Sequence, residues 1–238
     1  MPSVRVPGFQ PSVNGFAFSN AWPPNPIRQF RLGNVATLNL GDAANGLCGG
    51  MTFTVADLHN AGLKPGDLPQ PQAGSPKYGY IVDRQIASFD DGRLPLRFYE
   101  LMSPLRPERE SLLAEILGRF GVDRHSRTYA MVHEEWPGIR QAIDAGNLAM
   151  LGLVRVVSAD PLMLSQNHQV LAYGYDIDGS AVTLRICDPN WPRQDDVAIG
   201  FDTADPRGVV VPTWSKPDAR PICFFRAPYL PQDPTPFR

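Results

Sequence analysis

The order in which helical and extended patterns follow each other is the feature that most limits how this chain can fold. Between residues 45 and 145 the clearest apolar patterns repeat at helical spacing. From Leu148 onward the apolar residues come instead in short runs rich in Val, Leu and aromatics, separated by turn residues. Helices first and strands second predict an α+β fold with an antiparallel sheet.

Helices are expected over three segments: 45–60, 107–120 and 137–145. The first should begin close to Cys48 and end with a glycine cap at Gly62. Its apolar residues recur at helical spacing: Met51, Val55 and Leu58. In the second, a proline suits the first turn and an apolar stripe follows. The third stops at Gly146.

Strands are expected over five segments: 148–157, 168–175, 181–187, 209–212 and 221–226. The first is a continuous apolar run, as in a buried strand. The second and third flank the turn Asp-Ile-Asp-Gly and should form a hairpin. Two further segments, 78–82 and 94–99, are interpreted as strands or loop.

A single domain over 1–238 is the simplest organisation, because 238 residues that are 43% hydrophobic can build one sizeable core. The 25 prolines are about twice the usual share and concentrate near both ends and in 65–76. Proline does not fit helix interiors or central strands. We therefore expect residues 1–30 to be an N-terminal arm and residues 217–238 a proline-rich C-terminal tail.

The charge and cysteine content exclude several classes of protein. A formal net charge of −2 with scattered Lys and Arg argues against nucleic acid or an anionic membrane as partner. No apolar run could cross a bilayer, and residues 1–10 do not resemble a secretory signal. Three distant cysteines do not make a disulfide framework or a paired zinc site. We expect a soluble, cytoplasmic protein with reduced thiols; export without an N-terminal signal stays open, and the oligomeric state is not indicated.

The first candidate for chemistry is Cys48, in the sequence Asn-Gly-Leu-Cys-Gly-Gly-Met at the expected start of a helix. Unpaired N–H groups and the helix dipole favour the nucleophilic thiolate at such a position. The neighbouring glycines would leave room for a substrate backbone, and the Cys48 N–H could donate to an oxyanion. The alternative is that Cys48 is a small buried hydrophobic residue and that the glycines serve helix packing.

A candidate partner is His168, the first residue of the strand expected over 168–175. A histidine at the beginning of a strand should lie at the edge of the sheet, where it can reach the end of a neighbouring helix. The paired strand ends in Cys-Asp-Pro-Asn, so its return should bring Asp188 or Asn190 back beside His168. A carboxylate or amide there would hold the imidazole in the orientation that a general base needs. Taken singly, a surface histidine and an ordinary turn also explain these residues. Together with Cys48 they predict a Cys–His–Asp triad.

These local sequences resemble the papain-like cysteine peptidase superfamily, nearest to the branch of bacterial leader-peptide-processing (bacteriocin-type) peptidases. The resemblance is carried by Leu-Cys-Gly-Gly at 47–50, His-Gln-Val-Leu-Ala-Tyr-Gly-Tyr at 168–175 and Asp-Pro at 188–189. It implies a papain-like fold in which a central helix bearing the nucleophile packs on an antiparallel sheet. It also implies roles for individual residues: Cys48 as nucleophile, His168 as general base and acid, and Asp188 as orienting residue, with Asn190 as the substitute.

One departure from the family concerns the oxyanion hole. Family members usually place a Gln several residues before the Cys, where this chain has Asp42. A carboxylate would repel the developing oxyanion, so the amide donor would have to be Asn45 or the more distant Asn39. Loss of one such donor typically lowers the rate by about 10²- to 10³-fold.

The favoured hypothesis is therefore a cysteine hydrolase that cleaves a peptide or other amide bond in a peptide, a protein or a small amide, with no cofactor. Acyl transfer by the same triad, and a non-catalytic papain-like binding module, stay as alternatives. Other motifs give weaker indications of function. Asp176-Ile-Asp-Gly lacks the remaining ligands of a calcium loop, and the other histidines have no partner at metal-ligand spacing.

Overall fold

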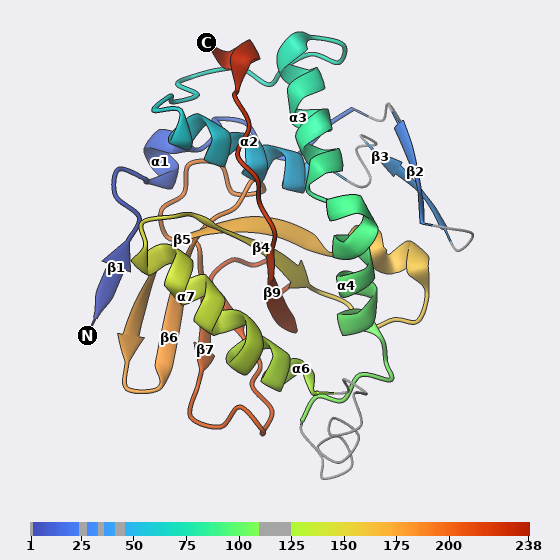
Figure 1. Cartoon of the computed structure of the whole chain (residues 1–238), viewed down its shortest axis with the longest axis vertical. Coiled ribbons are helices and arrows are strands. Elements are labelled where there is room, and N and C mark those ends of the chain that lie inside the picture. The colour runs from blue at the N-terminus through green and yellow to red at the C-terminus, as the bar shows by residue number, and fades with distance from the viewer. Residues whose placement is uncertain (1, 24–27, 33–35, 41–45, 110–124) are drawn as a thin grey trace.

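A computed structural model describes residues 2–23, 28–32, 36–40, 46–109 and 125–238, with only the backbone for 28–32 and 36–40. Within these ranges the chain forms a seven-stranded antiparallel sheet in the order β8-β7-β6-β5-β4-β9, with β1 paired to β5 (Figure 1). Helices pack against this sheet and share one hydrophobic core with it. The α+β class predicted from the sequence is confirmed.

The centre of the sheet is the long strand β5. Its first half pairs with β4, its second half pairs with β1 on the same edge, and its other edge pairs with β6. The strands of the sheet are β1 (Ser3–Arg5), β4 (Ala149–Val154), β5 (His168–Asp178), β6 (Ala181–Cys187), β7 (Ala198–Asp202), β8 (Thr213–Trp214) and β9 (Cys223–Ala227). A separate hairpin consists of β2 (Arg28–Leu32) and β3 (Ala36–Leu40).

Helices lie both across and beside the sheet. In Figure 1, α7 crosses in front of the sheet and contacts β5 and β9, whereas α2 and α3 lie above it. The helices are α1 (Pro11–Asn14), α2 (Cys48–Asn60), α3 (Pro76–Ala87), α4 (Arg93–Met102), α6 (Arg127–Tyr129) and α7 (Trp136–Asp144). A π-helical segment (Ala130–Glu135) joins α6 to α7, and short 3₁₀ turns cover Asp90–Gly92, Pro161–Gln166 and Thr235–Phe237.

Several elements agree with the sequence-based expectations. Helix α2 begins at Cys48, and Gly62 follows it with a left-handed φ of +68°. Helix α7, the strands β4 and β9, and the hairpin of β5 and β6 also lie where they were predicted. The helix expected over 107–120 falls mostly on residues 110–124, which lie outside the described part of the chain.

Three predicted segments were wrong. Residues 78–82 belong to α3 and residues 94–99 to α4, so neither is a strand or a loop. The strand expected over 209–212 is displaced to Thr213–Trp214, because Val209 and Val211 are exposed and Pro212 cannot donate to a ladder. Strands β1, β2, β3 and β7 were not predicted at all.

The N-terminal arm contributes directly to the core. Strand β1 pairs with the second half of β5, and α1 contacts α2. Beyond α1, Phe18 stacks on Phe16 and meets Trp22 edge-on, and Trp22 in turn contacts Tyr78 of α3. Phe16, Trp22 and Tyr78 are buried. Residues 3–22 therefore fasten the helical layer to the sheet.

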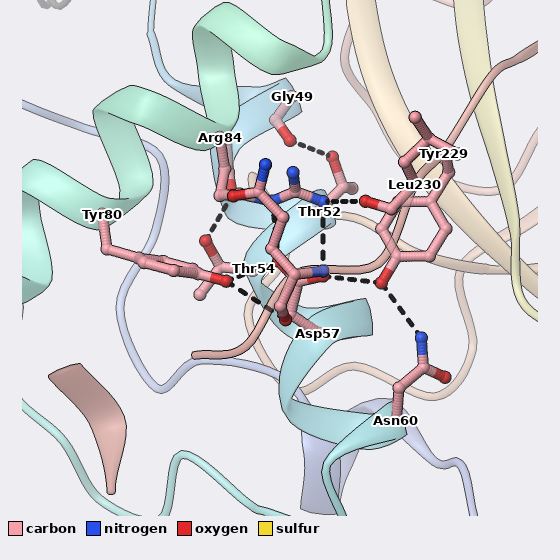
Figure 2. Close-up of polar contacts among 11 residues, drawn as sticks. Gly49, Thr52, Thr54, Asp57, Asn60, Tyr80, Arg84, Tyr229 and Leu230 are labelled. Atoms are coloured by element: carbon pink, nitrogen blue, oxygen red, sulfur yellow. Dashed lines mark hydrogen bonds and ion pairs between the residues drawn. The ribbon is translucent and has the colours of Figure 1, made fainter. Parts of the chain in front are cut away.

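The C-terminal tail is held by a buried ion pair between α2 and α3. Arg84 Nε lies 2.7 Å from Asp57 Oδ2, and both side chains are at most 1% exposed (Figure 2). The same carboxylate accepts hydrogen bonds from Tyr80, from the Tyr229 hydroxyl at 2.7 Å and from the Gln232 N–H at 2.9 Å. Burial and this carboxylate raise the pKa of both tyrosines. The tail thereby crosses α2 in a fixed position (Figure 1).

Replacement of Arg84 tests how much this cluster stabilises the fold. Arg84→Met leaves the Asp57 carboxylate buried without a counter-charge, and it removes the hydrogen bond to the Leu230 carbonyl. We expect the free energy of unfolding to fall by about 3–5 kcal/mol, measured by urea denaturation. Arg93→Met is the matched control, because Arg93 is exposed and its nearest carboxylate, Asp90, is 3.8 Å away. Equal midpoints for the two variants would contradict the assignment.

Candidate active site

Cys48 lies in the first turn of α2, where backbone N–H groups have no partner within the helix. Cys48 is the first helical residue after Leu47. Its own N–H has no hydrogen-bond partner among the described residues, whereas the Gly50 N–H donates to Gln85 Oε1 at 2.8 Å. Helix N-termini present such donors together with a positive partial charge. An anionic group on Cys48 or beside it is therefore favoured.

His168 lies directly at this helix start. It is the first residue of β5, and its side chain lies next to the Cys48 thiol, close enough for each group to shift the pKa of the other. On its other side, His168 Nε2 lies 2.7 Å from Asp188 Oδ1. Because Nε2 faces Asp188, Nδ1 is the ring nitrogen left for Cys48. The predicted return of the β5–β6 hairpin thus brings the three side chains together.

Asp188 follows the last residue of β6 and is itself held in place. Its Oδ1 accepts a hydrogen bond from the backbone N–H of Asn190 at 2.7 Å. The side chain of Asn190, which the sequence offered as an alternative orienting group, makes no hydrogen bond to His168 in the described structure. The contact with His168 belongs to Asp188, and Asn190 acts through its backbone alone.

Burial and charge together set the protonation of His168. Its side chain is 5% exposed, which by itself disfavours the imidazolium. The Asp188 carboxylate and the Cys48 thiolate more than offset this burial and raise the pKa of His168 to about 9. Near neutral pH the imidazole therefore carries a proton.

The three cysteines differ in the direction of their pKa shifts. Burial opposes ionisation of Cys48, but hydrogen bonds from His168 and from the Gln169 and Gly49 backbones, with the charge of His168, lower its pKa. Burial raises the pKa of Cys187 and Cys223 to about 12. All three are free and buried, so the contrast comes from the neighbours of Cys48. The two shifts therefore favour the ionised forms of Cys48 and His168 more than in an ordinary thiol and imidazole.

The two glycines after Cys48 serve packing. A Cβ on Gly50 would lie 2.1 Å from the Ile81 carbonyl oxygen, and a Cβ on Gly49 would lie 2.4 Å from Ser88 Oγ. Both distances are far below contact, so α2 can approach α3 only through glycine. The idea that these glycines leave room for a substrate is wrong. Packing, the alternative interpretation of these glycines, is the correct one.

A network of amides that the sequence analysis missed surrounds the helix start. Gln169 Nε2 donates to Ser88 Oγ at 3.2 Å, and Ser88 Oγ donates to the Gln85 carbonyl at 2.7 Å. These buried polar residues lie on α3, just after it, and on β5. Gln169 could have been noticed as the neighbour of His168. Gln85 and Ser88 could not, because the helix that carries Gln85 was not predicted.

The structure does not describe the oxyanion donors that the sequence offered. Asp42 and Asn45 lie outside the described residues, as does the side chain of Asn39.

Asp176, the first aspartate of the calcium-loop motif, is held by Ser3, Arg5 and Arg185. Although partial burial opposes ionisation, these partners lower the pKa of Asp176 to about 2.

Within the described ranges, no cluster of His, Cys, Asp or Glu is placed to hold a metal ion. Nor does any helix there have the length and apolar character that a bilayer span requires. No family model, curated protein or solved structure matches this chain.

The pH dependence of alkylation tests the ion pair. Iodoacetamide should modify Cys48 well below the pH at which an ordinary thiol ionises, because the pKa of Cys48 is lowered. Cys187 and Cys223 should stay unmodified across neutral pH, because burial raises their pKa to about 12. Peptide mapping by mass spectrometry follows each site separately.

The variant His168→Ala removes the cation and leaves Cys48 buried, so its fast labelling at neutral pH should disappear. Labelling of Cys48 that is no faster than that of Cys187, or that is indifferent to the loss of His168, would contradict the ion pair.

Proposed function

We propose that this chain is a cysteine hydrolase with a papain-like arrangement, which cleaves a peptide or other amide bond. The observation that carries the proposal is the meeting of three buried side chains: Cys48 at the first turn of α2, His168 beside it, and Asp188 at 2.7 Å from His168 Nε2. The pKa of Cys48 is lowered and that of His168 is raised, as in a thiol paired with an imidazole base. Such a pair is what an activated thiol nucleophile requires. The resemblance at 47–50, 168–175 and 188–189 supports the same function.

The first half of the reaction is acylation. The Cys48 thiolate attacks the carbonyl carbon, a C–S bond forms, and the electrons of the C=O bond move to oxygen. When the tetrahedral intermediate collapses, the C–N bond breaks, and His168 Nδ1 gives its proton to the leaving amine. The product is a thioester on Cys48 and a neutral imidazole.

The second half is deacylation. Neutral His168 accepts a proton from water, the resulting hydroxide attacks the thioester carbonyl, and the C–S bond breaks to return the thiolate. Asp188 stays ionised throughout. It holds the ring through Nε2 and stabilises the imidazolium whenever it forms. The carboxylate lies 2.7 Å from the ring, and the Asn190 N–H fixes its direction.

A peptide library digested with the purified protein and analysed by mass spectrometry tests the proposal. Cys48→Ala should abolish cleavage, and Asp188→Asn should lower its rate by about 10²- to 10⁴-fold, the range of a general acid–base contribution. Cys223→Ala is the matched control, because this buried thiol lies in β9 and takes no part in the triad. Cleavage that survives in Cys48→Ala would overturn the assignment.

The same experiment tests whether water or an amine accepts the acyl group from Cys48. Added hydroxylamine should compete with water for the thioester and give hydroxamate products in proportion to its concentration. Peptide acids as the sole product without the amine establish hydrolysis. Products joined to other amines would instead assign acyl transfer to the same triad. No modification of any peptide, together with slow alkylation of Cys48, would favour the non-catalytic binding module.

A further inference from the structure

The N-terminal arm places an asparagine between the Cys48 helix and the turn that carries Asp188. The backbone N–H of Asn20 donates to the Pro189 carbonyl at 2.9 Å. Its side-chain Oδ1 accepts a hydrogen bond from the Leu47 N–H at 2.7 Å, one residue before Cys48. Asn20 is therefore fixed to both sides of the candidate site.

The orientation of the Asn20 amide follows from its partners. Besides the Leu47 N–H, the indole N–H of Trp22 also donates to Oδ1, at 3.1 Å. Both partners can only donate, so the oxygen must face them and the NH₂ group must point the other way. Nδ2 makes no hydrogen bond to any described residue. Within the described part of the chain, this half-buried amide donor near Cys48 is therefore unpaired.

Gly46 makes room for this amide. Its φ is +61°, and a Cβ built on it would lie 2.4 Å from Asn20 Nδ2. Any other residue at 46 would be strained in its backbone and would displace the NH₂ group. A glycine is therefore required at position 46, two residues before Cys48, for the backbone to lie this close to Asn20 Nδ2.

We propose that Asn20 Nδ2 and the Cys48 backbone N–H together bind the oxyanion during acylation and deacylation. This inference rests on the proposed function. Among the described residues nothing accepts from the Cys48 N–H at the helix start, and the Asn20 amide is hydrogen-bonded to the preceding residue, Leu47. Two preorganised donors at the developing charge are the usual composition of such a site.

The arm thus supplies the amide for which sequence spacing offered Asn45 or Asn39. Asn20 lies 28 positions before Cys48, and nothing in the local sequence connects the two residues. The fold connects them, because the aromatic contacts of Phe18 and Trp22 hold this part of the arm against α3. A donor from the arm fulfils the role that the acidic Asp42 cannot.

Two reagents that differ in charge development separate this role from a structural one. Acetyl transfer from p-nitrophenyl acetate proceeds by attack of the thiolate on the carbonyl; an oxyanion forms, and its collapse breaks the C–O bond to release p-nitrophenolate. Alkylation by iodoacetamide displaces iodide at a saturated carbon and forms no oxyanion. An oxyanion donor should affect the first reaction alone.

Asn20→Asp is the most informative variant. The carboxylate can still accept from Leu47 and Trp22, but it donates nothing to an oxyanion. We expect acetylation of Cys48 to slow by about 10²- to 10³-fold. Alkylation by iodoacetamide should change by less than about threefold when both proteins are compared at a pH where Cys48 is fully ionised, because the added carboxylate also disfavours the thiolate. Asn20→Ala removes the donor without adding charge and should slow acetylation to a similar degree. Asn14→Asp is the same substitution at another arm residue, whose Oδ1 accepts from the Gln10 N–H at 2.9 Å, and it should leave both rates unchanged.

Each other outcome is decisive. Normal acetylation in Asn20→Asp, or slow acetylation in Asn20→Asp but not in Asn20→Ala, would show that Asn20 is not an oxyanion donor. Equal loss of acetylation and alkylation would give Asn20 a structural role only and overturn the inference. Failure of the proposed function itself has a different signature, since wild-type Cys48 would then react no faster than Cys187 with either reagent.

Discussion

The approach of α2 to α3 and β5 is the contact on which the rest of the structure depends. It is possible because two successive residues of α2 have no side chain: a methyl group at Gly50 would meet the backbone of Ile81 at 2.1 Å. Backbone cannot move aside as a flexible side chain can. The glycines therefore set the depth at which the helix start is seated, and with it the separation between Cys48 and His168.

Two carboxylates are buried among the described residues, Asp57 and Asp188, and they differ in how fully they are hydrogen-bonded. Both oxygens of Asp57 are engaged, by a guanidinium, two hydroxyls and a backbone N–H, and the group only holds elements together. Asp188 is different, because within the described structure its Oδ2 has no hydrogen-bond donor. Its charge is balanced chiefly by His168, so its electrostatic effect is concentrated on one ring. The Asp57 carboxylate, which holds elements together, has hydrogen-bond donors on both oxygens. The Asp188 carboxylate has fewer donors and acts mainly on the His168 imidazole.

The sequence revealed those parts whose signals are local. The glycine-bounded helix α2 and the hairpin of β5 and β6 have regular apolar patterns with turn residues at both ends. Helix α3 was missed because Gly79, Ile81 and Val82 disfavour helix and because its buried face includes Arg84, so the apolar period is broken. In α4, alternation of Leu94, Leu96 and Phe98 imitates a strand, although Leu96 is exposed.

The site divides in the same way. Cys48, His168 and Asp188 could be found because each lies at the end of an element with a readable pattern. Asn20 and Gln85 could not, since each reaches the helix start through tertiary packing alone. Such contacts leave no periodic trace in one sequence. The residues that touch the predicted triad were therefore harder to find than the triad itself.

The tail that crosses α2 also links the order of synthesis to the completion of the helix that bears Cys48. Gln232 follows Asp57 by 175 residues, so at about 5–20 residues per second the ribosome makes it roughly 10–35 s later. Until then the helix that bears Cys48 lacks two of the donors for its central carboxylate, and β4 lacks its neighbour β9. A nascent or prematurely terminated chain therefore lacks the donors and the strand that complete this helical layer.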